Sequence, residues 1–417
     1  MARFWAMWSV GVALLLALLI GMAGAVGQAR GGEMLRYVAA DLNNSFLAIY
    51  DLDVAFRIPI RLVRQDNLTY DLLFPSPNGQ LAFYSCDENI RCDLLVWNGK
   101  ELLNLTNETS INPHVPPAWS TDGKLAFLSC IPFCDVAIWD GSSIFTVIDT
   151  PNYNEAELTW GSNGQLAFQS CAPTCEVIVW NGDTLLHIGN TPDRVVDNLT
   201  WSLNGQLAFR SCGYNECDVM VWDGTVLHNL VNILREENFR QEDIGFAWNR
   251  TEELAFRVCT LDGCNVVIWD GVTVQPVVGL PNQFEASPTW SLDGRLAFIS
   301  CDNQRGGCDV LLWEDGNLTN ITNQPQAQHN LVWSIDEQLA FVSCPANCDV
   351  LVWSNNTLTN ISNTPFGGED YLTWDVEGQL AFVEYSTTQE IMLWDGTRLT
   401  QLTHTPTLNE YAPVWLP

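Results

Sequence analysis

The chain has 417 residues and a formal net charge of −31, from 18 basic and 49 acidic side chains. This excess of acid argues against a nucleic-acid-binding role, because contact with a phosphate backbone requires clustered Lys and Arg. Hydrophobic residues make up 47 % of the chain and aromatic residues 11 %, which excludes an intrinsically disordered protein. We therefore expect a folded protein without a nucleic-acid partner.

The first 26 residues are typical of a segment that directs export. Arg3 precedes an apolar run from Phe4 to Val26, and Ala23-Gly24-Ala25 supplies the small residues of a cleavage site. The run is also long enough to span a bilayer if it is retained. We predict that residues 1–26 are a signal peptide or an N-terminal membrane anchor. Either role places the rest of the chain outside the cytoplasm: extracellular, at the cell surface or periplasmic.

A repeat of about 43 residues accounts for the rest of the chain. The tripeptide Leu-Ala-Phe recurs with this spacing, beginning at Leu81, Leu125, Leu166, Leu207, Leu254, Leu296, Leu339 and Leu380. The apolar residues alternate along each unit, as they do in β-strands, and helix-length apolar patterns are absent. This period is typical of the four-stranded blades of a β-propeller.

The tryptophans of residues 33–417 repeat in the same register. They form two columns, one of Trp119, Trp160, Trp201, Trp248, Trp290, Trp333, Trp374 and Trp415, the other of Trp97, Trp139, Trp180, Trp222, Trp269, Trp313, Trp353 and Trp394. Large aromatic rings at equivalent positions fill the wedge between neighbouring sheets of a propeller. We therefore expect these rings to pack between blades.

Each repeat contains four predicted short strands. In one copy they cover residues 288–291, 295–300, 309–313 and 317–322, and Asp-Gly or Asn-Gly pairs mark the tight turns between strands.

The two ends of the chain complete one blade between them. Residues 35–39 resemble a second strand, and residues 411–415 resemble a first strand with nothing after it. Pairing of these segments closes the ring and removes two exposed sheet edges. We predict an all-β fold in which residues 33–417 form a propeller of nine four-stranded blades closed by the C-terminal strand. The alternative is eight blades, with the N-terminal strands outside the ring.

Fourteen cysteines fall into seven pairs, each between the second and third strand of a repeat. The pairs are Cys86/Cys92, Cys130/Cys134, Cys171/Cys175, Cys212/Cys217, Cys259/Cys264, Cys301/Cys308 and Cys344/Cys348. A zinc site would need four ligands, and the five histidines (His114, His187, His228, His329 and His404) do not accompany the pairs. An even, regular set of cysteines in an exported chain predicts disulfides that close the hairpins.

Two segments resemble the WD40-like repeat of TolB-type propellers. They are residues 119–127 and 290–298, each with a Trp-Ser start, an Asp-Gly turn and Leu-Ala-Phe. The resemblance implies the propeller fold over about residues 33–417 and assigns no function, because this fold serves many roles. The additional N-terminal α/β domain of TolB-like proteins has no room between Val26 and Leu35, and the sequence has no Gly-x-Ser-x-Gly motif of a hydrolase.

Acidic residues recur shortly before the first strand of several repeats. They are Asp71, Glu155, Glu157, Asp197, Asp243, Glu285, Asp370 and Glu410. Their repetition around a ring would bring carboxylates towards one opening, which suggests a cation-attracting mouth for Ca²⁺ or for a basic protein segment. The alternative is that these acids solvate loops or accept hydrogen bonds from nearby backbone amides.

No catalytic triad, phosphate-binding loop or cofactor motif is present in the sequence, and Ca²⁺ is the one candidate cofactor. We therefore predict an exported, disulfide-stabilised propeller that is not an enzyme and acts as a non-catalytic binding module for a protein or peptide, a basic one being favoured. The alternative is a secreted carbohydrate-active or hydrolytic enzyme that uses the loop face of the propeller.

Overall fold

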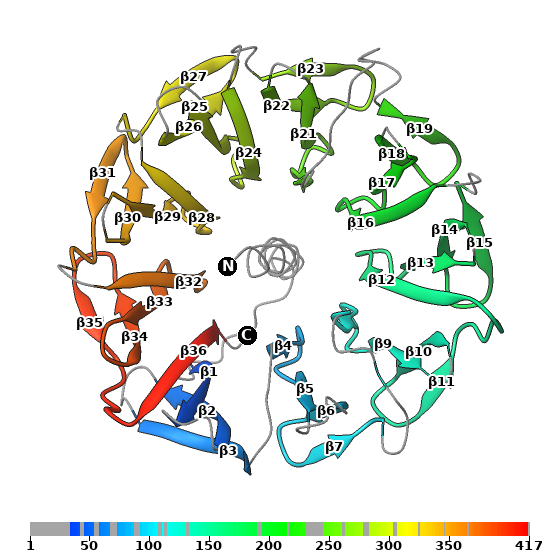
Figure 1. Cartoon of the computed structure of the whole chain (residues 1–417), viewed down its shortest axis with the longest axis horizontal. Helices are drawn as coiled ribbons and strands as arrows, with labels where there is room; N and C mark the ends of the chain where they lie inside the picture. Colours follow the sequence, from blue (N-terminus) through cyan, green and yellow to red (C-terminus); the bar gives the residue numbers. More distant parts are fainter. Residues whose placement is uncertain are drawn as a thin grey trace.

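Short β-strands arranged in sheets around a central axis make up the fold (Figure 1). The computed structural model describes residues 34–41, 46–53, 58–66, 73–86, 92–106, 111, 115–130, 133–172, 174–189, 194–214, 217–230, 245–260, 263–277, 283–302, 307–323, 326–345, 347–364 and 367–415. The expected export segment, residues 1–26, lies outside them. Within these ranges, no helix combines the length and apolar character needed to cross a membrane.

The strands occupy four concentric positions in the ring (Figure 1). The innermost are β4 (Leu73–Pro75), β8 (Ala118–Trp119), β12 (Asn154–Trp160), β16 (Val195–Trp201), β20 (Ala247–Trp248), β24 (Gln283–Trp290), β28 (Ala327–Trp333), β32 (Gly368–Trp374) and β36 (Leu408–Trp415). The second position holds β1 (Met34–Asp41), β5 (Leu81–Cys86), β9 (Leu125–Cys130), β13 (Leu166–Cys171), β17 (Leu207–Cys212), β21 (Leu254–Thr260), β25 (Leu296–Asp302), β29 (Leu339–Cys344) and β33 (Leu380–Tyr385).

The two outer positions follow the same order around the ring. The third holds β2 (Phe46–Asp53), β6 (Cys92–Trp97), β10 (Cys134–Trp139), β14 (Cys175–Trp180), β18 (Cys217–Trp222), β22 (Gly263–Trp269), β26 (Gly307–Glu314), β30 (Asp349–Ser354) and β34 (Gln389–Trp394). The outermost are β3 (Ile58–Asp66), β7 (Leu102–Asn104), β11 (Ile144–Thr146), β15 (Leu185–Ile188), β19 (Leu227–Asn229), β23 (Val274–Pro276), β27 (Asn317–Asn320), β31 (Thr357–Asn360) and β35 (Leu399–Gln401).

These strands form antiparallel sheets, as expected for a propeller. In the described residues there are seven four-stranded sheets and one eight-stranded sheet. The eight-stranded sheet is continuous only through one parallel pair, Cys264 with Phe284, between β22 and β24. The all-β propeller architecture is confirmed, whereas the count of nine blades stays a prediction.

The ring closes through the C-terminal strand. β36 pairs antiparallel with β1, and the sheet order is β3-β2-β1-β36. Arg36 in β1 lies opposite Val414, and Asp41 lies opposite Leu408. This sheet therefore joins the two ends of the chain, as the sequence predicted.

The tryptophans of the innermost strands connect neighbouring sheets. The indole Nε1 of Trp160 donates to the carbonyl oxygen of Ala118 at 3.1 Å, and Trp201 donates to Thr159 in the same way at 3.1 Å. Where one repeat contains a tryptophan from both columns, the two rings pack edge to face, as in Trp160 and Trp180, whose ring centroids are 6.1 Å apart. The rings thus fill the wedges as predicted, and they also join the sheets by hydrogen bonds.

The phenylalanine of Leu-Ala-Phe lies in the core of every repeat. The side chains are 0–2 % exposed at Phe83, Phe127, Phe168, Phe209, Phe256, Phe298, Phe341 and Phe382. Burial of such a side chain contributes roughly 1.5–3 kcal/mol relative to its exposure to water.

Disulfides close the hairpins between second and third strands. All seven predicted bonds form, with Cα–Cα separations of 3.9–4.0 Å. They join Cys86 to Cys92, Cys130 to Cys134, Cys171 to Cys175, Cys212 to Cys217, Cys259 to Cys264, Cys301 to Cys308, and Cys344 to Cys348. The predicted pairing is therefore confirmed.

The surroundings of Cys308 differ from the prediction. The sequence analysis placed Cys308 just before a third strand of residues 309–313, whereas β26 spans Gly307–Glu314 and includes this cysteine. The N–H of Cys308 donates to the carbonyl oxygen of Gln326 at 2.8 Å, and the N–H of Gln326 donates to Cys308 at 3.1 Å. The predicted start of this strand was wrong, because Cys308 and Gly307 also pair with Cys301 and Asp302 of β25 and lengthen the hairpin. The bridge to Gln326 is a separate contact, with the connection to the next sheet.

Candidate functional site

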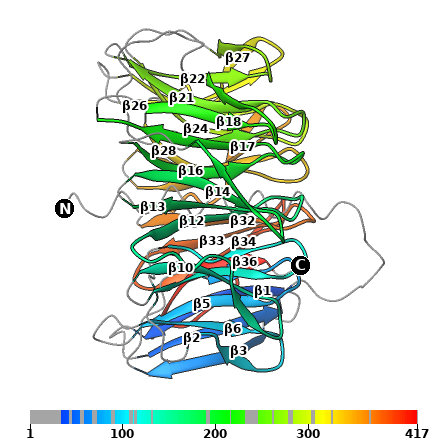
Figure 2. The same ribbon diagram turned by 90° about the vertical axis from the view of Figure 1, so that its right-hand side faces the viewer.

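The strands run between two faces of the ring (Figure 2). One face carries the connections from second to third strands and from outermost to innermost strands, and we call it the loop face. It is the face on which the sequence analysis placed the acidic residues. The innermost strands approach it through a β-bulge three residues before the tryptophan, where Glu157 and Tyr371 have φ angles of 55° and 57°.

One set of acidic side chains lies buried five residues before the innermost tryptophan: Glu155, Glu285, Glu369 and Glu410. Glu155 accepts hydrogen bonds from the hydroxyls of Thr150 at 3.0 Å and Ser170 at 2.9 Å. Glu285 accepts one from the backbone N–H of Val266 at 2.6 Å. These contacts match the alternative in which the acids bond neighbouring groups of the protein.

Burial raises the pKa of several of these carboxyls above the ordinary value for glutamate, so they stay protonated to a higher pH. It raises the pKa of Glu285 to about 7 and that of Glu369 to about 7. The pKa of Glu410 rises to about 8, first because of burial and then because of the nearby Glu390 carboxyl. A protonated carboxyl can donate a hydrogen bond, which an ionised one cannot.

The other acids of the predicted mouth are less deeply buried. Asp197 forms an ion pair with Arg210, and Asp370 accepts a hydrogen bond from the amide of Asn330. Burial raises the pKa of Glu157, and the neighbouring Asp197 raises it further. Asp71 and Asp243 lie outside the described residues. Glu285 and Glu410 are 0 % exposed, so a cation-attracting mouth stays a prediction for the remaining acids alone.

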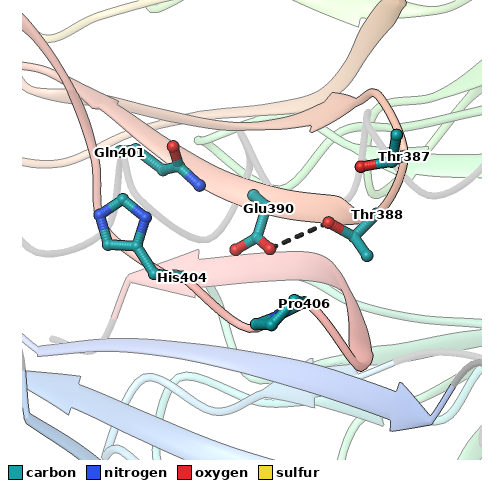
Figure 3. Close-up of a pocket in the computed structure, with 6 residues that line it drawn as sticks. All are labelled: Thr387, Thr388, Glu390, Gln401, His404 and Pro406. Carbon is teal, nitrogen blue, oxygen red and sulfur yellow. Dashed lines mark hydrogen bonds between the residues drawn. The ribbon is translucent and has the colours of Figure 1, made fainter.

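A cavity opens on the loop face beside the ring closure. Its volume is about 460 Å³, and its lining residues are Thr387, Thr388, Glu390, Gln401, His404 and Pro406 (Figure 3). They come from the connection between β33 and β34, from β34 itself (Glu390), from the neighbouring β35 (Gln401), and from the connection that leads into β36. Glu390 is the carboxyl of this lining set, and its Oε1 accepts a hydrogen bond from Thr388 at 3.0 Å.

Glu390 is paired with Glu410 behind the cavity wall. The Thr403 hydroxyl oxygen lies 2.9 Å from Oε2 of Glu390 and 2.7 Å from Oε2 of Glu410. A hydroxyl has one proton and can donate to only one of them. One carboxyl therefore has to carry a proton and donate to Thr403. Oε1 of Glu410 already accepts from the Thr405 hydroxyl, so its Oε2 is the natural place for that proton.

One set of potential metal ligands is present in the described ranges. Nε2 of His329 and the sulfurs of Cys344 and Cys348 lie within 4.8 Å of one another. The two sulfurs are joined in a disulfide, so they are not thiolate ligands.

Comparisons with solved structures identify the fold. A eukaryotic initiation factor structure has 12 % identity to this chain and a TM-score of 0.60, over 92 % of this chain and 98 % of that one. Porphyromonas gingivalis dipeptidyl peptidase 4 has 10 % identity and a TM-score of 0.57, over 89 % of this chain and 66 % of that one. The chain is a β-propeller. No family model and no curated protein matches it, so the TolB-type resemblance is supported only at the level of the fold.

The comparisons contradict the expectation that this chain is not an enzyme. The dipeptidyl peptidase shares this fold. A Mycobacterium tuberculosis puromycin-hydrolysing peptidase has 13 % identity and a TM-score of 0.49 over 81 % of this chain. The chain spans about half of that second protein, 53 %, and 66 % of the dipeptidyl peptidase. This fold thus also occurs in a catalytic protein, so it gives no support to the expected absence of catalysis.

Sequence reasoning missed the residues that form the cavity. Glu390 occupies a position that is Asp93, Asp135, Glu176, Asp218, Asp309 or Asp349 in other repeats, directly after the start of the third strand. That recurrence was a usable signal, because the acid before each first strand meets it in space. Glu369 was also missed, because the sequence analysis named only Asp370 beside it.

Proposed function

We propose that this chain is an exported, disulfide-stabilised propeller that hydrolyses peptides at the closure cavity of its loop face. The observation that carries the proposal is the position of Glu390, a carboxyl in the wall of a cavity of about 460 Å³. The seven disulfides support a location outside the cytoplasm, where such bonds persist. In this proposal residues 1–26 direct export and residues 33–417 form the propeller.

The proposed chemistry is general acid–base catalysis by Glu390. The ionised carboxylate takes a proton from a water molecule as the water oxygen bonds to the substrate carbonyl carbon. Glu390 then returns this proton to the amine as the C–N bond breaks, so the protons balance over the cycle. Glu410 is a positioning residue, because it reaches Glu390 through Thr403 and does not line the cavity. Gln401 supplies an amide donor for the substrate carbonyl oxygen.

The charge of the cavity favours a basic peptide as the substrate. Its lining contains a glutamate and, apart from the titratable His404, no basic side chain. The chain carries a net charge of −31, which attracts cationic ligands at low ionic strength. We therefore propose peptides that contain Lys or Arg as the first substrates to examine.

Mass spectrometry of peptide mixtures after incubation with the full chain tests the proposal. The expected result is cleavage of basic peptides, with Glu390→Gln reducing the rate by about 100-fold or more. Glu176→Gln is the matched control, because Glu176 holds the equivalent position in β14 away from the cavity. It should keep the wild-type rate, and thermal unfolding should show both variants folded. Binding without turnover, cleavage of glycans alone, or an unchanged rate in Glu390→Gln would contradict the proposal.

A further inference from the structure

The ring closure differs from the other described junctions in the hairpins that flank it. The sheets on its two sides, β32–β35 and β36 with β1–β3, contain no cysteine, whereas each of the seven remaining repeats has a disulfide at its second hairpin. In β33 and β34 the pair Tyr385 and Gln389 stands where Cys171 and Cys175 stand in β13 and β14. The second hairpins on both sides of this junction therefore lack the covalent bond that fixes the other hairpins.

Two side-chain contacts lie at that end: the N–H of Gln389 donates to the side chain of Asn409 at 3.2 Å, and Glu410, Thr403 and Glu390 form a chain of contacts. Glu390 is on β34, Thr403 follows β35, and Glu410 is on β36, so this chain of contacts links the last complete sheet to the strand that closes the ring (Figure 1). Glu390 is 7 % exposed and Glu410 is 0 % exposed. With one proton on Glu410, every group in the chain has a partner: Glu410 donates to Thr403, and Thr403 donates to Glu390.

The surroundings offer no positive charge to replace that proton. The titratable groups facing the pair are Tyr37 on β1, Glu384 on β33 and, across the cavity, His404, while Tyr50 on β2 stacks on Tyr37. In the described part of the chain, no Lys, Arg or His forms an ion pair with Glu390 or Glu410. Two ionised carboxylates this close and this buried repel each other strongly.

We propose that the Glu390–Glu410 pair is a pH-sensitive latch that holds the ring closed while it shares a proton and loosens the closure when that proton is lost. The apolar contacts of Tyr37, Ile391 and Leu402 deeper in the junction keep the strands together, so loosening is confined to the loop-face end. The raised pKa of Glu410, about 8, places the change near neutral to mildly alkaline pH. The latch adjoins the cavity and does not depend on whether peptides are hydrolysed there.

Hydrogen exchange of the full chain, read by mass spectrometry at about pH 6 and about pH 9, tests the latch. Protection factors, which correct for the intrinsic effect of pH on exchange, should fall by about tenfold in residues 408–415 at the higher pH. Residues 195–201 of β16, where the non-titratable Val196 stands at the position of Glu410, should change much less. Unchanged protection of β36 in the wild-type protein would overturn the proposal without any variant.

The Glu410→Gln variant distinguishes the effect of losing the proton from the effect of losing the packing of this side chain. The Gln amide can donate to Thr403 as the protonated carboxyl does and has no proton to lose at either pH. Protection of β36 should then be the same at both pH values, whereas Glu369→Gln, the equivalent change one sheet earlier, should leave the wild-type response in β36. A wild-type response in Glu410→Gln would overturn the proposal. If Glu410→Gln does not fold, Glu390→Gln removes the same repulsion and should give the same flat profile.

Discussion

The indole Nε1 of Trp415 donates a hydrogen bond of 3.1 Å to the carbonyl oxygen of Thr373, and this bond links the C-terminal strand β36 to β32. The same bond recurs between other neighbouring sheets, from Trp374 to Val332 at 3.2 Å and from Trp119 to Phe74 at 2.8 Å. Closure of the ring thus uses a contact that also joins most of the other neighbouring sheets. Trp248 is the exception in this column, because its buried Nε1 has no hydrogen-bond partner.

We predict that Trp415→Phe weakens the closure. The variant loses one hydrogen-bond donor and part of a packed ring, which should lower the free energy of unfolding by about 1–3 kcal/mol. Urea denaturation measures this loss, and hydrogen exchange should show faster exchange in β1 and β36. Trp201→Phe, which breaks the equivalent bond to Thr159 inside the ring, is the control and should instead affect β16. Equal exchange patterns in the two variants would contradict a local role for Trp415.

Glu285 should make the fold less stable as the pH rises. Burial raises its pKa to about 7 from an ordinary value of 4.5, so between these values the folded chain binds a proton that the unfolded chain has released. The stability that this proton provides is complete below about pH 4.5 and is lost as the pH rises through about 7.

Glu285→Gln should remove this dependence while keeping an acceptor for the N–H of Val266. Near pH 8 the variant should be more stable than the wild type by about 1–3 kcal/mol, and near pH 4.5 the two should agree. Denaturation curves across this range provide the measurement, with the exposed Glu101→Gln as a control. A variant that is less stable than the wild type at both pH values would show that Glu285 is needed as an anion.

The repeat explains why the fold was predictable from the sequence. The Leu-Ala-Phe tripeptide, the tryptophans and the cysteines recur at equivalent positions of several repeats. A wrong alignment of the strands would therefore have been wrong in every copy, which makes the correct alignment easy to recognise. The pairing of β36 with β1 followed in the same way. The C-terminal repeat has only a first strand, and the N-terminal repeat has the other three, so together they make one sheet. Contacts that the repeat does not encode were missed, as at Cys308 with Gln326. The joining of two four-stranded sheets into one eight-stranded sheet was also missed, and it depends on a single residue pair, Cys264 and Phe284.

The candidate site was less predictable because it arises where the repeat is broken. Glu384 replaces a serine such as Ser170 or Ser343, and it lies directly opposite both Glu369 and Glu390. Whether such acids meet in one buried pair depends on strand register and on the connection to the next sheet. The sequence shows the carboxyls one at a time, whereas their shared contact with Thr403 exists only in three dimensions.

Arg295 should contribute more to stability than an ordinary surface arginine. Its guanidinium carbon lies 5.1 Å from the ring centroid of Trp333 and 5.3 Å from that of Trp353, both in the next sheet. It also forms ion pairs with Asp293 at 3.0 Å and with Glu337 at 3.2 Å. Lys lacks the planar group that stacks on the rings and holds two carboxylates.

We therefore predict that Arg295→Lys costs about 0.5–2 kcal/mol in the free energy of unfolding. Chemical denaturation at low and high salt measures the cost and separates the stacking from the ion pairs, since salt screens the latter. Arg398→Lys is the control, because Arg398 is exposed at the turn before β35. An equal change in the two variants would mean that the stacked geometry adds nothing.

We predict that a disulfide can be introduced into the β33–β34 hairpin, which lacks one. Tyr385 lies directly opposite Gln389 across β33 and β34, as Cys171 lies opposite Cys175, and both pairs are separated by four residues along the chain. Tyr385→Cys combined with Gln389→Cys should therefore form an eighth bridge under oxidising conditions. In the chain-entropy description such a short loop adds about 2 kcal/mol, from which the lost packing of Tyr385 has to be subtracted.

The comparison that isolates the bridge is the double variant before and after selective reduction of the new bond. Intact mass and peptide mapping verify the bond, and denaturation of the two forms gives its contribution without the packing loss. Hydrogen exchange should become slower at the β33–β34 hairpin when the bond is present. Since the latch pair Glu390–Glu410 is beside this hairpin, the fall in β36 protection at alkaline pH should also shrink. If the bond forms and the hairpin exchanges as fast as before, the missing disulfide is not what makes this junction weaker.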